Sequence, residues 1–237
     1  MSQSLFKFKR FEMLHGKGSM KIGVDAVLIG AWAGEGKNIL EVGTGCGVIS
    51  LILAQRFTEA QILAIDIDIP SVEEASENFS NSPWGERLRS ELIKFPEGIN
   101  SNIEKYDLII SNPPYFRSGI TAPLTPRLKA RHQDSLSVFT LLDNSPSLLI
   151  PGGRLCMIFP VEFEDEAIKF ASQKSLVPVR ICRVRDNRRR SEKRVMTEFK
   201  YLENSEINTK FEYLTLFEDG KPTDDYLKLC KDFYLKF

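Results

Sequence analysis

The sequence predicts an α/β protein built on a doubly wound, largely parallel sheet. Apolar runs of strand length alternate with helical stretches from residue 38, a glycine-rich turn follows the first run, and the alternation stops near residue 175. Such alternation is typical of parallel sheets with helical crossovers. The expected strands are Asn38–Val42, Gln61–Asp66, Arg87–Ile93, Tyr106–Ser111 and Arg154–Phe159. The expected helices are Val48–Arg56, Pro70–Phe79, Ser135–Leu149 and Glu162–Gln173.

Local signals support these elements in order. The run NILEV at 38–42 predicts a buried strand, and the turn GTGCG follows it directly. Pro70 stands in the first turn of its helix, where a missing backbone N–H costs nothing. The stretch Pro151–Gly153 is expected to end the helix before it, because proline and glycine interrupt helices.

After residue 175 three strands are expected without helices between them: Leu176–Val184, Val195–Leu202 and Phe211–Phe217. Strands joined by short connections are usually antiparallel, so an antiparallel section is expected to close the sheet. The sequence therefore predicts one domain over residues 1–237, with residues 1–35 as an N-terminal extension packed on it.

The composition argues for a reduced, cytoplasmic protein without a metal or a membrane segment. Lys and Arg number 32 and Asp and Glu number 32, so any attraction to nucleic acid must be local. No apolar run reaches the roughly 18 residues that span a bilayer, and the N-terminus lacks a signal peptide. The four cysteines have no CxxC spacing and only two histidines are present, so no metal is expected.

The loop after the first strand predicts a nucleoside-containing cofactor. Glycines at 43, 45 and 47 lie between a strand and a helix, where a ligand can approach the backbone closely. The spacing departs from the dinucleotide fingerprint G-x-G-x-x-G, whose last glycine would fall at Val48. Glu41 stands two residues before Gly43; its carboxylate would repel a pyrophosphate and attract the ammonium and sulfonium end of S-adenosylmethionine.

Asp66 closes the second strand, where this fold places a carboxylate for ribose hydroxyls. The alternative is a solvated turn rich in aspartate, since Asp68 follows closely. Together with the glycine loop, Asp66 indicates a nucleoside-containing cofactor, and Glu41 favours S-adenosylmethionine over NAD.

The turn Asn112–Tyr115 follows the fourth strand and predicts a site for a planar amine. Ligands in open α/β sheets bind outside the carboxyl ends of the strands, so this turn should lie beside the glycine loop. The Asn112 side-chain oxygen and the Pro113 carbonyl could accept both N–H groups of an exocyclic amine, and Tyr115 could stack on its ring. Pro113 and Pro114 would hold these groups in place before the substrate arrives. The alternative is an ordinary strand-ending turn, for which N-P and P-P are common.

These residues resemble the class I S-adenosylmethionine-dependent methyltransferases, and the NPPY turn resembles the subgroup that methylates planar nitrogens. A narrower resemblance covers nearly the whole chain. The stretch Lys21–Trp32, the pair Arg131-His132 and the ending Asp232–Phe237 are similar to tRNA (adenine-N6)-methyltransferases, which modify the adenosine 3′ of the anticodon of a valine tRNA.

This resemblance implies a Rossmann-like, seven-stranded methyltransferase sheet, S-adenosyl-L-methionine as cofactor and tRNA as substrate. It also implies a role for each matching residue. The implied cofactor contacts are Lys21, Gly23, Asp25, Glu41, Gly43, Gly45, Asp66, Glu91 and Asn112. Glu91 is the candidate for the cofactor adenine amine, although the usual aspartate is missing from RSELIKF. The implied amine site comprises Asn112, Pro113, Pro114 and Tyr115.

A basic stretch at residues 180–194 is the local feature most suited to RNA. It carries eight Arg and Lys against Asp186 and Glu192. Phosphate contact and a solvated charged face both remain open for it. The candidate RNA-binding residues are Arg131, Arg188, Arg189, Arg190 and Arg194. Phe6, Phe8 and Phe11 alternate with basic residues, which fits either an RNA-contacting strand or an edge strand with one buried face.

Two other functions remain as alternatives. The same cofactor could serve another planar nitrogen, in rRNA guanine-N2, DNA adenine or a protein glutamine. A protein of another class, an RNA-binding scaffold with a vestigial cofactor fold, is disfavoured because Glu41, Gly43, Asp66 and Asn112 are all present.

Overall fold

The computed structural model describes residues 4–18, 22–99, 105–114, 136–202 and 208–237. A hairpin pairs β1 (Ser4–Lys7) with β2 (Glu12–His15). The other strands are β3 (Asn38–Val42), β4 (Gln61–Asp66), β5 (Leu88–Leu92), β6 (Tyr106–Ser111), β7 (Leu149–Pro160), β8 (Leu176–Asn187), β9 (Arg194–Tyr201), β10 (Lys210–Glu218) and β11 (Lys221–Pro222). The α-helices are α1 (Val24–Trp32), α2 (Val48–Arg56), α3 (Ile69–Ser80), α5 (Val138–Asn144), α6 (Glu164–Ser172) and α7 (Asp224–Cys230).

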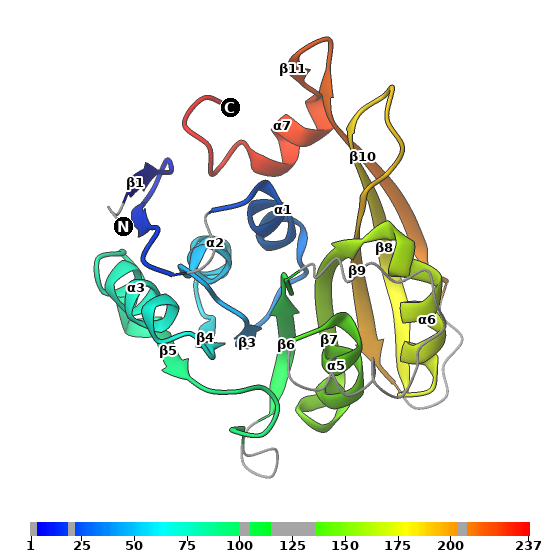
Figure 1. Cartoon of the computed structure of the whole chain (residues 1–237), viewed down its shortest axis with the longest axis horizontal. Helices are drawn as coiled ribbons and strands as arrows, with labels where there is room; N and C mark the ends of the chain where they lie inside the picture. Colours follow the sequence, from blue (N-terminus) through cyan, green and yellow to red (C-terminus); the bar gives the residue numbers. More distant parts are fainter. Residues whose placement is uncertain (1–3, 19–21, 100–104, 115–135, 203–207) are drawn as a thin grey trace.

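In the described part of the chain, nine strands form one sheet in the order β11-β10-β8-β9-β7-β6-β3-β4-β5 (Figure 1). The strands from β5 to β7 run parallel, and β9 is antiparallel to both of its neighbours. The predicted α/β class with a mostly parallel sheet is confirmed. The order β8-β9-β7-β6-β3-β4-β5 contains the seven strands that the resemblance implies, and β10, the strand expected at Phe211–Phe217, and β11 extend it beyond β8.

Helices cover both faces of the parallel strands. Helices α1, α2 and α3 lie on one face, and α5 and α6 lie on the other (Figure 1). Central strands buried on both faces must be apolar throughout, and Ile39, Leu40, Ile109 and Ile110 are fully buried. This burial is why β3 and β6 have the residue limits that the sequence predicts.

Three parts of the chain differ from expectation. Helix α1 lies inside the expected N-terminal extension and is buried from Ala26 to Trp32, so it lacks the one-sided apolar stripe that marks a surface helix. Helix α7 was also not expected. Strand β7 begins at Leu149 rather than Arg154, so Pro151–Gly153 lies within the strand, where its register with β6 shifts.

The expected antiparallel section is antiparallel in part. Strand β9 is antiparallel to β8, but β10 joins the outer edge of β8 in parallel, with Tyr213 opposite Arg183. Sequence spacing gives the strands but not which edge each one joins, so this pairing was not predicted.

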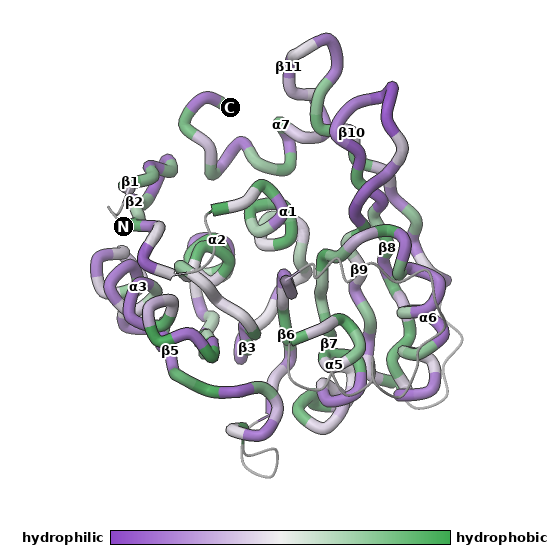
Figure 2. The backbone as a smooth tube through the Cα atoms, in the orientation of Figure 1, coloured by the Kyte–Doolittle hydropathy of each residue, from purple (hydrophilic) through white to green (hydrophobic). Residues whose placement is uncertain are grey.

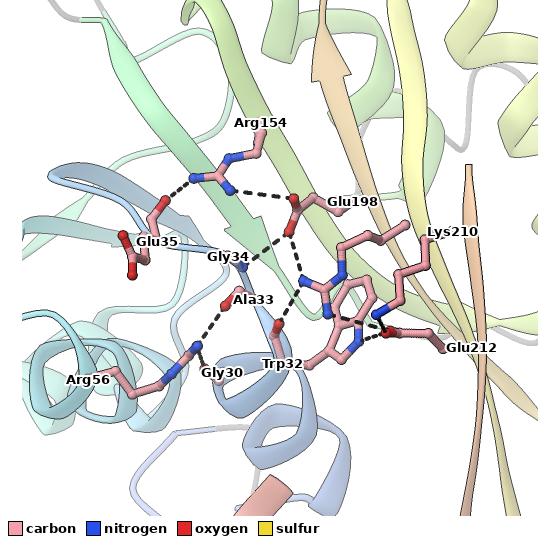
Figure 3. Close-up of polar contacts among 11 residues, drawn as sticks. Gly30, Trp32, Ala33, Gly34, Glu35, Arg56, Arg154, Glu198, Lys210 and Glu212 are labelled. Carbon is pink, nitrogen blue, oxygen red and sulfur yellow. Dashed lines mark hydrogen bonds and ion pairs between the residues drawn. The ribbon is translucent and has the colours of Figure 1, made fainter. Parts of the chain in front are cut away.

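A chain of ion pairs joins the end of α1 to the strands beside it (Figure 3). Arg180 lies 3.5 Å from Glu198 and 3.5 Å from Glu212, and its guanidinium stacks 4.1 Å above the Trp32 ring. The Trp32 indole N–H donates to Glu212 at 2.8 Å, and Arg154 lies 3.5 Å from Glu198. Each charge in this partly buried network has an opposite partner, so the network fixes α1 against β8–β10.

The N-terminal aromatic residues are part of the packing. Phe8 and Phe11 are buried and their rings stack with centroids 4.5 Å apart, and Phe8 forms a bridge with Tyr234. These two rings are therefore buried by packing, as the edge-strand interpretation expects, although both lie just outside β1 and β2. Within the described ranges, none of the helices combines the length and apolar character that crossing a membrane requires.

Candidate active site

The glycine loop connects β3 to α2 and is hydrogen-bonded to the end of β4. Gly43 and Thr44 donate backbone hydrogen bonds to the Ile65 carbonyl at 2.8 and 3.0 Å. Gly43 and Gly47 have φ of +78° and +85°, a region that suits glycine. A Cβ on Gly47 would come within 2.5 Å of the Phe79 ring. Backbone conformation therefore favours glycine at both positions, and packing also requires it at Gly47. Without side chains at its glycines, the loop exposes its backbone groups at the edge of the sheet.

Glu41 is fully buried below this loop. Its Oε2 accepts hydrogen bonds from the Ser50 backbone N–H, at 3.1 Å, and from the Ser50 hydroxyl. Burial raises the pKa of Glu41 to about 7, while the hydrogen bonds from Ser50 act in the opposite direction. Among the described residues, its Oε1 has no hydrogen-bond partner. A buried acceptor in this position is suited to a cationic or N–H-bearing ligand.

Asp66 joins the glycine loop to the turn after β4. Its Oδ2 accepts from the Gly45 N–H at 2.9 Å and its Oδ1 accepts from the Asp68 N–H at 3.1 Å. Asp68 caps α3 by accepting from Ser71. The two aspartates therefore have different tasks: Asp68 begins a helix, and Asp66 remains half-buried beside the loop.

Asn112 emerges beside Gly43 because β6 is the neighbour of β3. Val42 is paired with Ser111, so the chain leaves both strands at the same level. The Ser111 hydroxyl donates to the Val42 carbonyl at 2.7 Å. Asn112 and Pro114 are half-buried and Pro113 is buried, and Tyr115 lies outside the described residues. The structure thus brings the amine-site and cofactor-site candidates to one edge of the sheet.

The N-terminal end of α1 reaches the same edge but is held by an arginine. Gly23 caps the helix, and the next-but-one residue, Asp25, pairs with Arg194 at 3.1 Å. Arg194 also pairs with Asp186, and its side chain is only 18% exposed. Arg194 therefore links α1 to the start of β9. The sequence predicts an RNA contact for Arg194 and not this structural role. Lys21 lies outside the described residues.

The adenine side of the cofactor site differs from the expectation in detail. Glu91 lies on β5 opposite Ile65 and forms an ion pair with Arg89. Two apolar side chains that were not singled out lie at the end of the neighbouring strands: Ile67 is 61% exposed and Leu92 is 54% exposed. The sequence contains a signal for Ile67, which lies between Asp66 and Asp68. An apolar residue in a polar turn has no core to fill.

Three arginines of the basic stretch lie on the turn between β8 and β9. Arg188, Arg189 and Arg190 are exposed, and this turn is strongly hydrophilic (Figure 2). Arg188 pairs with Glu218 at 3.2 Å with two thirds of its side chain in solvent. Arg131 lies outside the described residues. The turn leaves the sheet at the carboxyl end of β8, the edge that also carries the glycine loop.

The donor set fits S-adenosylmethionine better than a metal ion. The described residues contain no group of three or more His, Cys, Asp and Glu side chains placed to hold a metal. The unpartnered Glu41 Oε1 provides an acceptor for a cationic amino-acid end. The half-buried Asp66 carboxylate could accept from ribose hydroxyls, and the exposed Ile67 and Leu92 side chains could cover a base.

Comparison with known proteins agrees with this geometry. Residues 22–168 match the family model described as the methyltransferase small domain. A protein of Bacteroides fragilis named tRNA1(Val) (adenine(37)-N6)-methyltransferase is 38% identical over 239 residues, covering 100% of both chains. A protein of the same name from Vibrio vulnificus is 38% identical and covers 98% of this chain and 95% of its own.

Solved structures share the fold at low sequence identity. A predicted O-methyltransferase from Agrobacterium tumefaciens has a TM-score of 0.68 at 15% identity, over 88% of this chain and 96% of that one. The N-methyltransferase NodS from Bradyrhizobium japonicum, in complex with S-adenosyl-L-homocysteine, has a TM-score of 0.53 at 16% identity, over 75% of this chain and 84% of that one. The chain belongs to the methyltransferase small domain family and, within it, to the group of proteins named tRNA1(Val) (adenine(37)-N6)-methyltransferase.

Proposed function

We propose that this protein transfers a methyl group from S-adenosylmethionine to the exocyclic N6 amine of adenine 37 in tRNA1(Val). The observation that carries the proposal is the placement of Asn112 and Pro113 beside Gly43, directly above the buried Glu41. Full-length relatives at 38% identity bear the name of this reaction.

The amine is activated by orientation. An adenine amine is a weak nucleophile because its lone pair is delocalised into the ring. The Asn112 side-chain oxygen and the Pro113 carbonyl accept its two N–H groups, which favours a pyramidal nitrogen with its lone pair free. The residues on either side fix this arrangement: Ser111 is bonded to β3, and two prolines restrict the turn.

The reaction needs no general base in the described site. Bound S-adenosylmethionine would supply the methyl group, with the nitrogen–carbon bond forming as the sulfur–carbon bond breaks and the sulfur of the departing S-adenosylhomocysteine keeping the bonding electron pair. The amine becomes positively charged during transfer and then loses a proton to solvent. Asn112 and Pro113 stabilise that developing charge because both present oxygen acceptors.

Different residues of the protein contact different parts of the methyl donor. Glu41 holds the ammonium end, the backbone of the loop at Gly43 and Gly45 lies against the donor, and Asp66 accepts from the ribose. Ile67 and Leu92 pack on the adenine, and Glu91 is retained as the proposed partner of its amine. The adenine to be methylated must be turned out of its stack to reach the turn at Asn112, where Tyr115 is proposed to stack on it.

The tRNA substrate also suggests a cytoplasmic location. The Arg188–Arg190 turn is proposed to contact tRNA phosphates from the edge that carries the catalytic turn, and Arg131 is proposed to add a further contact.

The decisive experiment is methylation of an unmodified tRNA1(Val) transcript by the purified protein with labelled S-adenosylmethionine. Digestion to nucleosides and mass spectrometry should give N6-methyladenosine, and a transcript with guanosine at position 37 should remain unlabelled. Label in N2-methylguanosine, in DNA or in protein would replace the proposed acceptor, and absence of transfer to any of them would favour the scaffold.

A further inference from the structure

The outer face of β10 exposes two aromatic rings that no helix or strand of the described residues covers. Phe211 is 60% exposed and Tyr213 is 62% exposed, whereas Leu214 and Leu216 on the opposite face are buried against the core. Strand residues alternate between faces, so Phe211 and Tyr213 lie on the same side. Large rings exposed together on a strand have no packing role, which marks a surface for a partner.

The neighbouring strand places arginines beside these rings. Tyr213 is paired with Arg183, and Thr215 is paired with Arg185 in the parallel register of β10 and β8. Arg183 is fixed by two hydrogen bonds to Glu164, at 2.8 and 2.9 Å. Arg185 donates to the Thr215 hydroxyl at 2.8 Å, and none of the carboxylates in the described ranges forms an ion pair with it. This β10 face (Phe211, Tyr213, Arg183 and Arg185) is therefore aromatic, and its net positive charge comes from Arg185, because Glu164 balances the charge of Arg183.

Aromatic rings interleaved with arginines on a sheet fit a single-stranded nucleic acid. Bases stack on exposed rings regardless of sequence, and guanidinium groups pair with the phosphates between them. A protein partner would also accept the rings, but it would need carboxylates to match the arginines. The charge on the face favours the polyanion.

The β10 face lies within reach of the catalytic edge. Four strand steps separate β6 from β10, or about 19 Å at normal strand spacing. The exposed Arg188 turn leaves the end of β8 between them. A structured RNA whose reactive base enters at Asn112 can therefore place a neighbouring unpaired segment on β10.

We propose that the β10 face is a stacking platform for unpaired nucleotides of the tRNA substrate, with Phe211 and Tyr213 under the bases and Arg185 on a phosphate. This inference rests on the proposed function for the identity of the RNA. It adds a substrate contact on the side of the molecule away from the helices that hold the cofactor loop.

The test removes the rings and retains the charges. In the double variant Phe211→Ser/Tyr213→Ser, the dissociation constant for unmodified tRNA1(Val), measured by filter binding, should rise about 5- to 100-fold. The dissociation constant for S-adenosylmethionine should not change. The slope of log affinity against log salt should also be unchanged in this variant, whereas Arg185→Gln should flatten it by about 0.7 to 0.9.

Two controls separate stacking from other causes. Phe211→Tyr/Tyr213→Phe keeps both rings and should bind tRNA like the original protein, and Ile150→Ser removes an exposed apolar side chain elsewhere and should have no effect. Unchanged tRNA binding in the ring-deleted variant would overturn the inference. Sedimentation velocity showing a dimer that the ring deletion dissociates would assign the face to a second copy instead.

Binding and chemistry are read separately in this design. A protein that binds tRNA but produces no N6-methyladenosine would refute the proposed function, while the β10 face would still stand or fall on the binding measurement. A protein that methylates normally and is indifferent to loss of the rings would refute only the β10 face.

Discussion

The Ser111 hydroxyl donates a 2.7 Å hydrogen bond to the Val42 carbonyl, joining the last residue of β6 to the last residue of β3. Both residues are buried, and the residue that follows each strand belongs to the proposed site: Asn112 after β6 and Gly43 after β3. The alignment of amine site and cofactor loop is therefore fixed inside the sheet rather than by the loops alone.

Removing this bond should slow catalysis more than it weakens cofactor binding. Ser111→Ala leaves the buried Val42 carbonyl without its partner and should lower the free energy of unfolding by about 1 kcal/mol. The rate of methyl transfer should fall, while calorimetry should show the S-adenosylmethionine dissociation constant changed by less than about twofold. Ser147→Ala removes an exposed serine bond outside the site and should change neither quantity.

Asn112→Ala should reduce kcat about 100-fold or more, because an acceptor aimed at the reacting amine is lost. Single-turnover methylation of tRNA1(Val) measures this step, and calorimetry checks that S-adenosylmethionine still binds. A parallel loss of cofactor binding and turnover would show that Asn112 holds the cofactor rather than the amine.

Asp66→Asn should weaken S-adenosylmethionine binding about 10- to 100-fold, because ribose hydroxyls lose a charged acceptor. The matched variant is Asp68→Asn two residues away, where asparagine caps α3 as well as aspartate does. Equal effects from the two substitutions would point to disturbance of the turn and not to ribose recognition.

The pH dependence of cofactor binding should follow Glu41. Burial raises its pKa from 4.5 to about 7 in the free protein, so near neutrality a large share of the carboxyl is protonated. The cationic cofactor binds the charged form, so affinity should rise about tenfold from pH 6 to pH 8, with proton release on binding at the lower pH. Calorimetry in two buffers of different ionisation enthalpy measures the proton, and Glu41→Gln should abolish the dependence.

The sign is opposite for stability. Because the folded pKa of Glu41 is raised, its contribution to folding is fully present below about pH 4.5 and is lost as the pH rises through about 7. The free protein should therefore gain thermal stability from Glu41→Gln at pH 8 but little at pH 5.

Substitution of Arg188, Arg189 and Arg190, on the turn between β8 and β9, should affect tRNA binding, whereas substitution of Arg194, at the start of β9, should affect stability. Replacing Arg188, Arg189 and Arg190 together with glutamine should flatten the salt dependence of tRNA binding by about two to three units. Arg194→Gln should instead lower the melting temperature, because it leaves Asp25 and Asp186 without a shared cation. An unchanged salt slope in the triple variant would return the turn to a solvated charged face.

The sequence predicted the catalytic edge because that edge is built from short-range signals. The glycines follow the buried run that contains Glu41, Asp66 closes another, and β3, β4, α2 and β6 have the predicted residue limits. Topology then brings the candidates together, since parallel strands end at one edge.

Other features depend on packing that the sequence does not display. Helix α1 is buried on all sides from Ala26 to Trp32, so its apolar residues do not recur on one face only. The sequence therefore predicts only an N-terminal extension there. Charge counts cannot separate Arg194, held between Asp25 and Asp186, from the exposed Arg188. The exposure of Phe211 and Tyr213 follows from the pairing of β10 with β8, which spacing alone does not give.

The position of β10 also bears on association between copies of the protein. Only Phe217 and Glu218 of β10 pair with β11, so in the described chain the rest of its outer backbone has no strand partner. Open edges of this kind recruit other chains into intermolecular sheets, and charged side chains oppose it. Lys210 and Glu212 lie on this strand, and because Glu212 also holds Trp32, replacing the exposed Lys210 with valine is the change that should increase aggregation.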